Sequence, residues 1–140
     1  MRIRTRAREI ALQYLYQIDI THAHSEETLE AFFSHFVNDK EVVPYARELV
    51  CGVYDSLIRI DALIEQASEN WKVSRMSTTD RNILRIATYE LAFKPDIPYK
   101  VAINEAIELA KRFGSPRFPA FANGVLDKVW SEVSPHGSTC

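Results

Sequence analysis

The chain has 140 residues, which is the length of a single domain with one hydrophobic core. Hydrophobic residues make up 46% of it and charged residues 26%, a balance that excludes a disordered or fibrous chain. No apolar run approaches the roughly 18 residues of a membrane span, and the N-terminus lacks the apolar segment of a secretory signal. The two cysteines cannot form a disulfide framework, so we expect a protein of the reducing cytoplasm.

The net charge of −2 by itself argues against a nucleic-acid partner, but the charge is distributed unevenly. Residues 1–8 hold four arginines and no acid, and residues 9–70 hold 12 acids and 3 bases. Residues 71–140 hold 10 bases and 7 acids. Such an asymmetry indicates nucleic-acid contact, whereas a solvated basic tail is the alternative explanation.

The first half of the chain has the periodicity of three helices. The first helix carries an apolar stripe formed by Ala7, Ile10, Ala11, Tyr14, Leu15 and Ile18. A second helix is expected after Ser25, a good N-cap residue. A third begins near Pro44, which a first helical turn tolerates, and continues as one long seam to Ala67.

The segment 70–79 interrupts this pattern, and three further helices follow it. Ser77 followed by Asp80 resembles a capping box at the start of the fourth helix. The fifth helix follows Pro98, has an apolar stripe that includes Phe113, and ends at Gly114. The last helix carries the apolar residues Phe121, Val125, Leu126 and Val129.

No segment alternates as a strand does, so we predict an all-α helical bundle of about six helices. Residues 1–140 form one domain in this prediction, with three helices on either side of the interruption. The N-terminal lobe covers about 1–70 and the C-terminal lobe about 77–133. The polar tail 134–140 is expected to fray.

Signals of catalysis or metal binding are poor. The histidines lack metal-ligand spacing, so we expect no metal, no cofactor and no enzymatic activity. Cys51 lies on an apolar stripe and is expected to be a core thiol. Glu105 and Glu108 could act as paired carboxylates, but the nearby Lys111 and Arg112 favour a solvated helix face.

The first helix has a second, polar face opposite its apolar stripe. At 100° per residue, Arg2, Arg6, Gln13 and Tyr16 fall together there, with Arg8 on a flank. Arginine offers donors matched to phosphate, tyrosine a platform for an unpaired base, and glutamine a reader of base edges. This face therefore favours nucleic-acid binding, although an exposed polar face without a ligand is the alternative.

Arg81 and Arg85, one helical turn apart, leave two interpretations open. They could extend the basic surface, or they could pair with Asp80 and Glu90.

Four motifs of this chain resemble the NusB family of bacterial transcription factors. The first is R-x-R-x-R-A-R-E-I-A-L-Q-x-L-Y-Q-x-D at 2–19, and the second is I-L-R-I-A-T-Y-E-L at 83–91. The most specific are I-P-Y-K-V-A-I-N-E-A-I-E-L-A-K-R-F-G at 97–114 and F-A-N-G-V-L-D-K at 121–128. Their order and spacing match over essentially the whole chain.

The resemblance implies a non-enzymatic, two-lobed helical protein. It implies pairing with NusE, a small-subunit ribosomal protein, and binding of single-stranded boxA in nascent ribosomal RNA. It also implies a place in the antitermination complex of RNA polymerase. The positions matching the family's RNA contacts are Arg2, Arg4, Arg6, Arg8, Tyr16 and Phe121. The chain departs from the family at 115–120, where Arg117 adds positive charge beside Phe121.

We therefore predict an RNA-binding transcription antitermination factor. Its predicted RNA surface consists of Arg2, Arg4, Arg6, Arg8, Gln13, Tyr16, Arg117 and Phe121. Four phosphate contacts would give the affinity a log–log salt slope of about −3. The alternatives are a protein-binding helical adaptor and an accessory domain of an RNA methyltransferase. The sequence does not distinguish a monomer from a homodimer.

Overall fold

The computed structural model describes residues 2–134 and is helical, with no strand in that range. The all-α prediction is therefore confirmed. Apart from Ser134, the tail that was predicted to fray lies outside the described residues. The α-helices are α1 (Arg2–Thr21), α2 (Glu26–Phe36), α3 (Val43–Asp55), α4 (Leu57–Ala67), α5 (Thr78–Phe93), α6 (Tyr99–Phe113) and α7 (Phe118–Val133), and two 3₁₀ helices cover Lys40–Val42 and Val73–Arg75.

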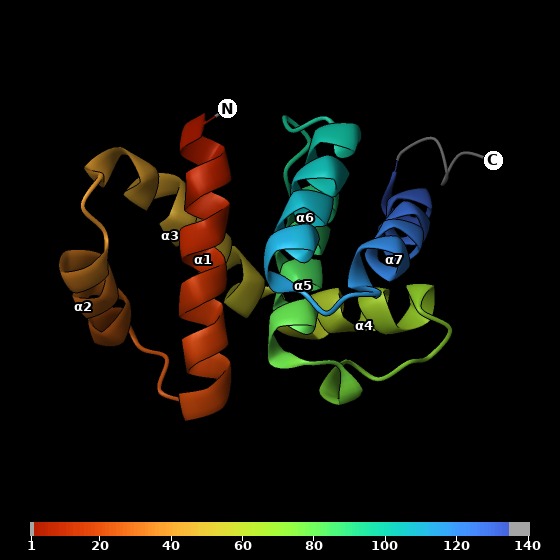
Figure 1. Ribbon diagram of the computed structural model, residues 1–140, viewed down its shortest axis with the longest axis horizontal. Coiled ribbons are helices and arrows are strands. Elements are labelled where there is room, and N and C mark those ends of the chain that lie inside the picture. The colour runs from red at the N-terminus through yellow and green to blue at the C-terminus, as the bar shows by residue number, and fades with distance from the viewer. Residues whose placement is uncertain (1, 135–140) are drawn as a thin grey trace.

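The helices form two groups joined along α1 (Figure 1). In one group α2 and α3 lie on one side of α1, and in the other α5, α6 and α7 stand side by side with α4 across their lower ends. Helix α1 packs against both α3 and α5, so it holds the two groups together. None of the helices described combines the length and apolarity that a membrane crossing requires.

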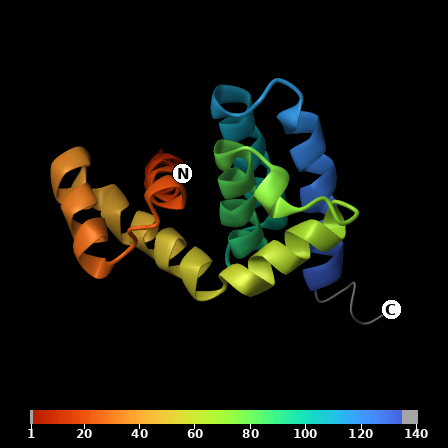
Figure 2. The same cartoon turned by 90° about the horizontal axis from the view of Figure 1, so that it is seen from below.

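The predicted third helix is in fact two helices, α3 and α4. The chain leaves helical geometry at Ser56, whose φ is −120° and ψ is 23°. Figure 2 shows α3 and α4 meeting at an angle there, which lets α4 pack against α5 and α7. No proline or glycine occupies the junction, and Val53, Leu57 and Ile60 keep helical spacing across it. The bend is imposed by tertiary packing, which periodicity does not report.

The capping residues predicted from the sequence occupy their expected places. The Ser25 hydroxyl accepts a hydrogen bond from the Thr28 N–H at 3.0 Å, at the start of α2. The Ser77 hydroxyl accepts one from the Asp80 N–H at 3.1 Å, at the start of α5. Each bond satisfies a backbone donor that the first helical turn leaves free.

The apolar stripe of α1 forms the centre of the core. All six of its predicted members are buried, with at most 3% of each residue exposed. They pack in one continuous cluster with apolar residues of every other α-helix. Burial of such a stripe fixes the rotation of α1 about its axis, and this determines which α1 side chains face solvent.

Candidate nucleic-acid interface

The solvent-facing side of α1 carries four of the predicted site residues. Arg2, Arg6, Gln13 and Tyr16 are all exposed, and Tyr16 retains 45% of its surface. They share one face, as the 100° spacing predicts, because the opposite face is fixed in the core. Two guanidinium groups, an amide and a phenol ring therefore lie along one strip of surface.

A groove of about 570 Å³ runs beside this strip, between α1 and the ends of α5 and α6. Gln13, Tyr16 and Ile20 line it from α1, Thr79 from α5 and Phe113 from α6. Phe113 is 45% exposed and Ile20 is 55% exposed. Exposed rings beside amide and hydroxyl groups suit a flat, partly polar ligand such as a nucleobase.

Two arginines meet at one edge of the groove and share a single carboxylate. The Arg6 guanidinium donates to Glu9 at 2.8 Å, and the Arg112 guanidinium donates to the other Glu9 oxygen. Burial raises the pKa of Glu9, but the hydrogen bonds and charges of Arg6 and Arg112 outweigh burial and hold this pKa below its usual value. Glu9 is therefore ionised at neutral pH and leaves a net positive charge at this edge.

Arg112 also lies over an aromatic ring. Its guanidinium carbon is 4.8 Å from the centroid of Phe113, within the range of a cation–π contact. Sequence reasoning missed both residues as site residues, because Phe113 has the spacing of a core residue of α6. The signal that could have identified it is its position directly before Gly114, since the last residue of a helix is often less covered than the stripe it continues.

Arg117 and Phe121 lie at a second hollow, of about 420 Å³, at the start of α7. Arg117 is exposed, while Phe121 is half-buried with its ring centroid 6.3 Å from that of Phe118. The second hollow adjoins the groove, because Phe113 lines one and Ser115 lines the other. The structure thus brings the α1 strip and the Arg117–Phe121 pair onto neighbouring parts of the surface.

The turn between the two hollows is tied to α5 through Asp80. The Asp80 carboxylate accepts hydrogen bonds from the Ser115 N–H at 3.2 Å and from the Ser115 hydroxyl at 2.8 Å. Asp80 is 8% exposed, so these are shielded contacts to a charged acceptor. They fix the end of α6 and the start of α7 relative to α5.

We expect Gly114→Ala to destabilise the protein, because the glycine in this turn has no room for a side chain. An added Cβ would lie 2.8 Å from the Ala110 carbonyl oxygen, 2.9 Å from Phe118 and 3.1 Å from Asp80. Overpacking of this kind costs about 1–3 kcal/mol, measurable as a lower urea midpoint. Gly124→Ala in α7 is the matched control, because its Cβ meets no atom within 4 Å and alanine favours a helix. Equal midpoints for the two variants would contradict the crowding at Gly114.

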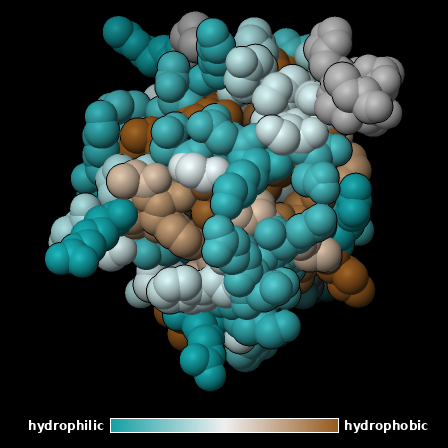
Figure 3. Space-filling view, turned by 90° about the vertical axis from the view of Figure 1, so that its right-hand side faces the viewer, coloured by the Kyte–Doolittle hydropathy of each residue, from teal (hydrophilic) through white to brown (hydrophobic). Residues whose placement is uncertain are grey.

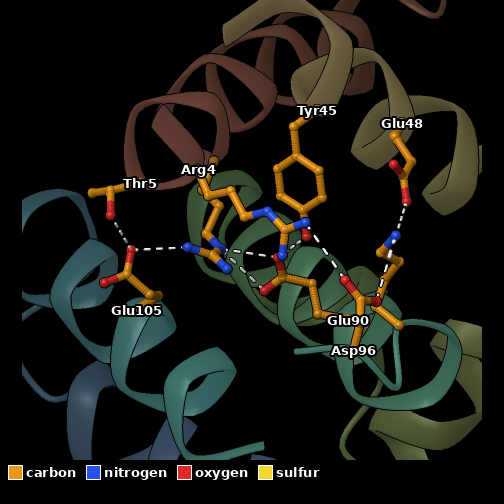
Figure 4. Close-up of polar contacts among 9 residues, drawn as sticks. Arg4, Thr5, Tyr45, Glu48, Glu90, Asp96 and Glu105 are labelled. Carbon is orange, nitrogen blue, oxygen red and sulfur yellow. Dashed lines mark hydrogen bonds and ion pairs between the residues drawn. The ribbon is translucent and has the colours of Figure 1, made fainter. Parts of the chain in front are cut away.

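Arg8 does not reach the proposed surface, in contrast to the sequence prediction. Its side chain is 3% exposed, and its Nε donates to Glu90 at 2.9 Å while its Nη1 donates to Glu105 at 3.0 Å. The Tyr45 hydroxyl donates to the same Glu90 carboxylate, and Thr5 donates to Glu105 at 2.7 Å (Figure 4). Because Arg8 is buried, with its Nε and Nη1 engaged inside the protein, it is not available to a phosphate, so we leave it out of the RNA surface.

Burial acts on the acidic partner of this cluster. It raises the pKa of the Glu90 carboxyl above its usual value, while the charge of Arg8 and the hydrogen bond from Tyr45 act in the opposite direction. Glu105 was expected on a solvated face; instead it accepts hydrogen bonds from α1. The cluster therefore links α1, α3, α5 and α6 at the centre of the molecule.

Arg4 lies next to this cluster rather than on the strip with Tyr16. Its guanidinium is 4.7 Å from the centroid of the Tyr45 ring and 3.5 Å from Asp96. Its side chain is 42% exposed, so it borders solvent on the α3 side of α1. Helical spacing of 100° per residue rotates it by about 160° from Arg6 and by about 120° from Tyr16 around the α1 axis.

Arg81 and Arg85 form ion pairs, although with other acids than the two considered from the sequence. Arg81 Nε lies 2.7 Å from Asp19, and Arg85 pairs with Asp19 at 3.3 Å and with Asp61 at 2.9 Å. Both arginines are less than one-fifth exposed. These charges join the C-terminal end of α1 to α4 and α5 and do not extend the basic surface.

Two kinds of reactive site considered from the sequence, a metal site and a thiol nucleophile, can be compared with the described residues. No group of three histidine, cysteine, aspartate or glutamate side chains in residues 2–134 could hold a metal ion. Cys51 is half-buried in α3, and burial raises the pKa of its thiol, which is therefore protonated at neutral pH. A protonated thiol is a poor nucleophile.

Comparisons with known proteins address the family and the fold of this chain. The model of the NusB family matches residues 5–131. The transcription antitermination protein NusB of Desulfatibacillum aliphaticivorans is 48% identical, over 90% of this chain and 88% of the relative. The NusB structure of T. maritima is 37% identical with a TM-score of 0.84, covering 97% of this chain and 96% of that one.

A further similar structure shows a NusB protein in an assembly. It contains the antitermination factors NusB and NusE in complex with double-stranded RNA. The matching chain has a TM-score of 0.83 and 26% identity, covering 94% of this chain and 98% of that one. With the family model, the relatives and the fold in agreement, this chain belongs to the NusB family.

Proposed function

We propose that this protein is an RNA-binding transcription antitermination factor that binds single-stranded boxA RNA together with NusE. It acts in the antitermination complex of RNA polymerase, in the cytoplasm, by binding alone and without a cofactor. The observation that carries the proposal is the exposed strip of α1 beside an aromatic-lined groove. Membership of the NusB family supports it, as do the RNA and NusE bound in a structurally similar complex.

The mechanism divides the surface into charged and aromatic contacts. Arg2, Arg6 and Arg117 neutralise phosphates and set the position of the strand, because phosphate contacts carry affinity without sequence information. Tyr16 and Phe113 offer ring faces to unpaired bases. Gln13, which lines the same groove, supplies an amide that hydrogen-bonds a base edge. NusE enlarges the surface and raises the affinity.

We expect boxA affinity to fall as salt rises, with a log–log slope of about −2. The estimate counts the three arginines that contact phosphates in this mechanism, Arg2, Arg6 and Arg117, at about −0.7 each. Arg8 is left out because it is buried, and Arg4 because it pairs with Asp96 away from the strip. The measurement is a boxA titration with the NusE-free protein at several salt concentrations. A flat dependence would contradict the role of the exposed arginines, and a slope near zero for Arg6→Gln alone would assign all the charge contacts to one residue.

A gel shift with boxA and scrambled RNA, each with and without NusE, tests the proposal against a protein-binding adaptor. Preference for boxA supports an RNA-reading function. Tight NusE binding with equal, weak retention of both RNAs would identify an adaptor instead. The mass of the protein in solution, with and without RNA, determines whether a homodimer forms and whether RNA dissociates it.

A further inference from the structure

The second hollow, beside Phe121, has a further aromatic residue in its wall, Trp71, which lies outside the RNA surface proposed above. Trp71, in the connection between α4 and α5, is 55% exposed, and its ring centroid lies 5.8 Å from that of Phe121. The two rings are inclined at 60°, so they form a corner and leave a face of the indole open. Trp71 also lines a third hollow, of about 560 Å³, and therefore lies between the second and the third hollow.

The connection that carries Trp71 is held in place. Val73 is 3% exposed, and its N–H donates to the Glu65 carboxylate of α4 at 2.9 Å. The Trp71 carbonyl accepts a hydrogen bond from the Ser68 hydroxyl at 3.2 Å. A ring presented on a fixed segment loses little conformational entropy when it binds, which favours affinity.

Three cations surround the indole without an acidic partner. The second and third hollows are lined by Lys72, Arg75 and Arg117. None of these three side chains forms an ion pair or hydrogen bond within residues 2–134. In contrast, most arginines of this chain, such as Arg8 and Arg112, are paired. Unpaired cations gathered around an open ring suit a ligand that is both flat and negatively charged.

The nearby acids do not neutralise these cations. Asp80 borders the second hollow and accepts hydrogen bonds from Ser115, which carries no charge, but two cations, Arg75 and Arg117, line the same hollow and outnumber it. Glu69 borders the third hollow and pairs with Lys128 at 3.4 Å. The surface around Trp71 therefore carries more positive than negative charge. A nucleotide combines a flat ring with a negative charge, whereas an acidic side chain lacks the ring and a neutral aromatic side chain lacks the charge. On the face that contains α7, apolar side chains gather in patches among hydrophilic ones (Figure 3).

We propose that Trp71 and Arg75 form a second nucleotide subsite, which binds an unpaired base and its phosphate from the same RNA strand that occupies the α1 groove. The inference rests on the proposed function and extends its surface. Phe113 borders the groove and Ser115 borders the second hollow, and at most about 7 Å of backbone separates these two residues. At roughly 3.4 Å per stacked nucleotide, a strand crosses this distance in about two nucleotides.

In this subsite the base stacks on the open face of Trp71. Arg75 and Arg117 contact the phosphates on either side of this base. Lys72 adds positive charge at the third hollow. Stacking on a ring tolerates every base, so the subsite adds affinity and length to the footprint without adding sequence preference.

The test compares three RNAs: a boxA oligonucleotide and two versions extended by three uridines, one at the 5′ end and one at the 3′ end. Wild-type protein is expected to bind one extended RNA about 5- to 150-fold more tightly than the short one. Trp71→Ala is expected to lose that gain and to bind the short RNA normally. Trp71→Phe, which keeps a ring, is expected to retain part of it, and Arg75→Gln to make the salt slope for the extended RNA shallower by about 0.7.

A spectroscopic readout separates stacking from a structural role of the ring. The chain has two tryptophans, so the Trp130→Phe variant reports the fluorescence of Trp71 alone. The extended RNA is expected to quench this fluorescence and the short RNA to leave it unchanged. If wild type binds all three RNAs equally, or Trp71→Ala keeps the gain, the subsite is absent while the proposed function stands. If wild type binds none of them above scrambled RNA, the proposed function itself fails.

Discussion

Replacing Arg8 by methionine is expected to lower the free energy of unfolding by about 3–5 kcal/mol. The substitution leaves the Glu90 carboxylate, whose side chain is 1% exposed, without its guanidinium partner. It also removes the donor that binds Glu105 at 3.0 Å, so contacts from α1 to both α5 and α6 are lost. An uncompensated buried charge is the source of the cost, and the measurement is a urea denaturation midpoint.

Arg4→Met is the matched control for Arg8→Met, because it makes the same change one helical turn away. Arg4 pairs with Asp96 at 3.5 Å in a half-exposed position, so its loss costs about 0–1 kcal/mol. Folded Arg8→Met protein, compared at equal native concentration, is expected to bind boxA nearly as well as wild type. A stable Arg8→Met variant with strongly reduced RNA affinity would contradict the buried position and restore Arg8 to the RNA surface.

Tyr16→Ala is expected to weaken boxA binding by about 1–3 kcal/mol, or about 5- to 150-fold, the range measured for loss of one base–aromatic contact. The ring lines the groove and is 45% exposed. Its removal therefore deletes a stacking platform without opening a cavity in the core. Affinity from RNA titrations and the melting temperature of the free protein are the two quantities to compare.

Two variants bracket this expectation. Tyr16→Phe keeps the ring and should retain most of the affinity. Phe36→Ala removes a ring that is 66% exposed on α2, away from the groove, and should leave boxA binding unchanged. If Tyr16→Ala mainly lowers the melting temperature and spares RNA binding, the ring has a packing role and the strip on α1 is not the interface.

The α1 strip could be predicted from sequence because it depends on local geometry alone. A helix of 3.6 residues per turn with one apolar stripe has a defined opposite face, so Gln13 and Tyr16 are exposed as expected. Arg8 shows the limit of the same reasoning. It lies on the flank of the stripe, where exposure depends on which helix packs beside it, and here Glu90 is supplied from 82 residues away.

The pairing of charges in the acidic middle of the chain likewise depends on the tertiary structure. From sequence, its acids and the arginines of α5 were separate charge blocks. In the structure two of these acids, Asp19 and Asp61, pair with Arg81 and Arg85, so the four charges do not contribute to a basic or an acidic surface. The unpaired cations that remain, such as Arg117, determine where RNA can bind, and net charge does not identify them.

The sequence by itself determined the helical class, the capping residues Ser25 and Ser77, the exposed face of α1 and, through its motifs, the NusB family. Each of these depends on residues close together in the chain or on a pattern read in order. Only the tertiary structure decided the bend at Ser56, the burial of Arg8 and the meeting of Phe113 with Tyr16 across a groove. These features arise from contacts between residues distant in sequence, and their energies depend on which side chains pack beside one another in space.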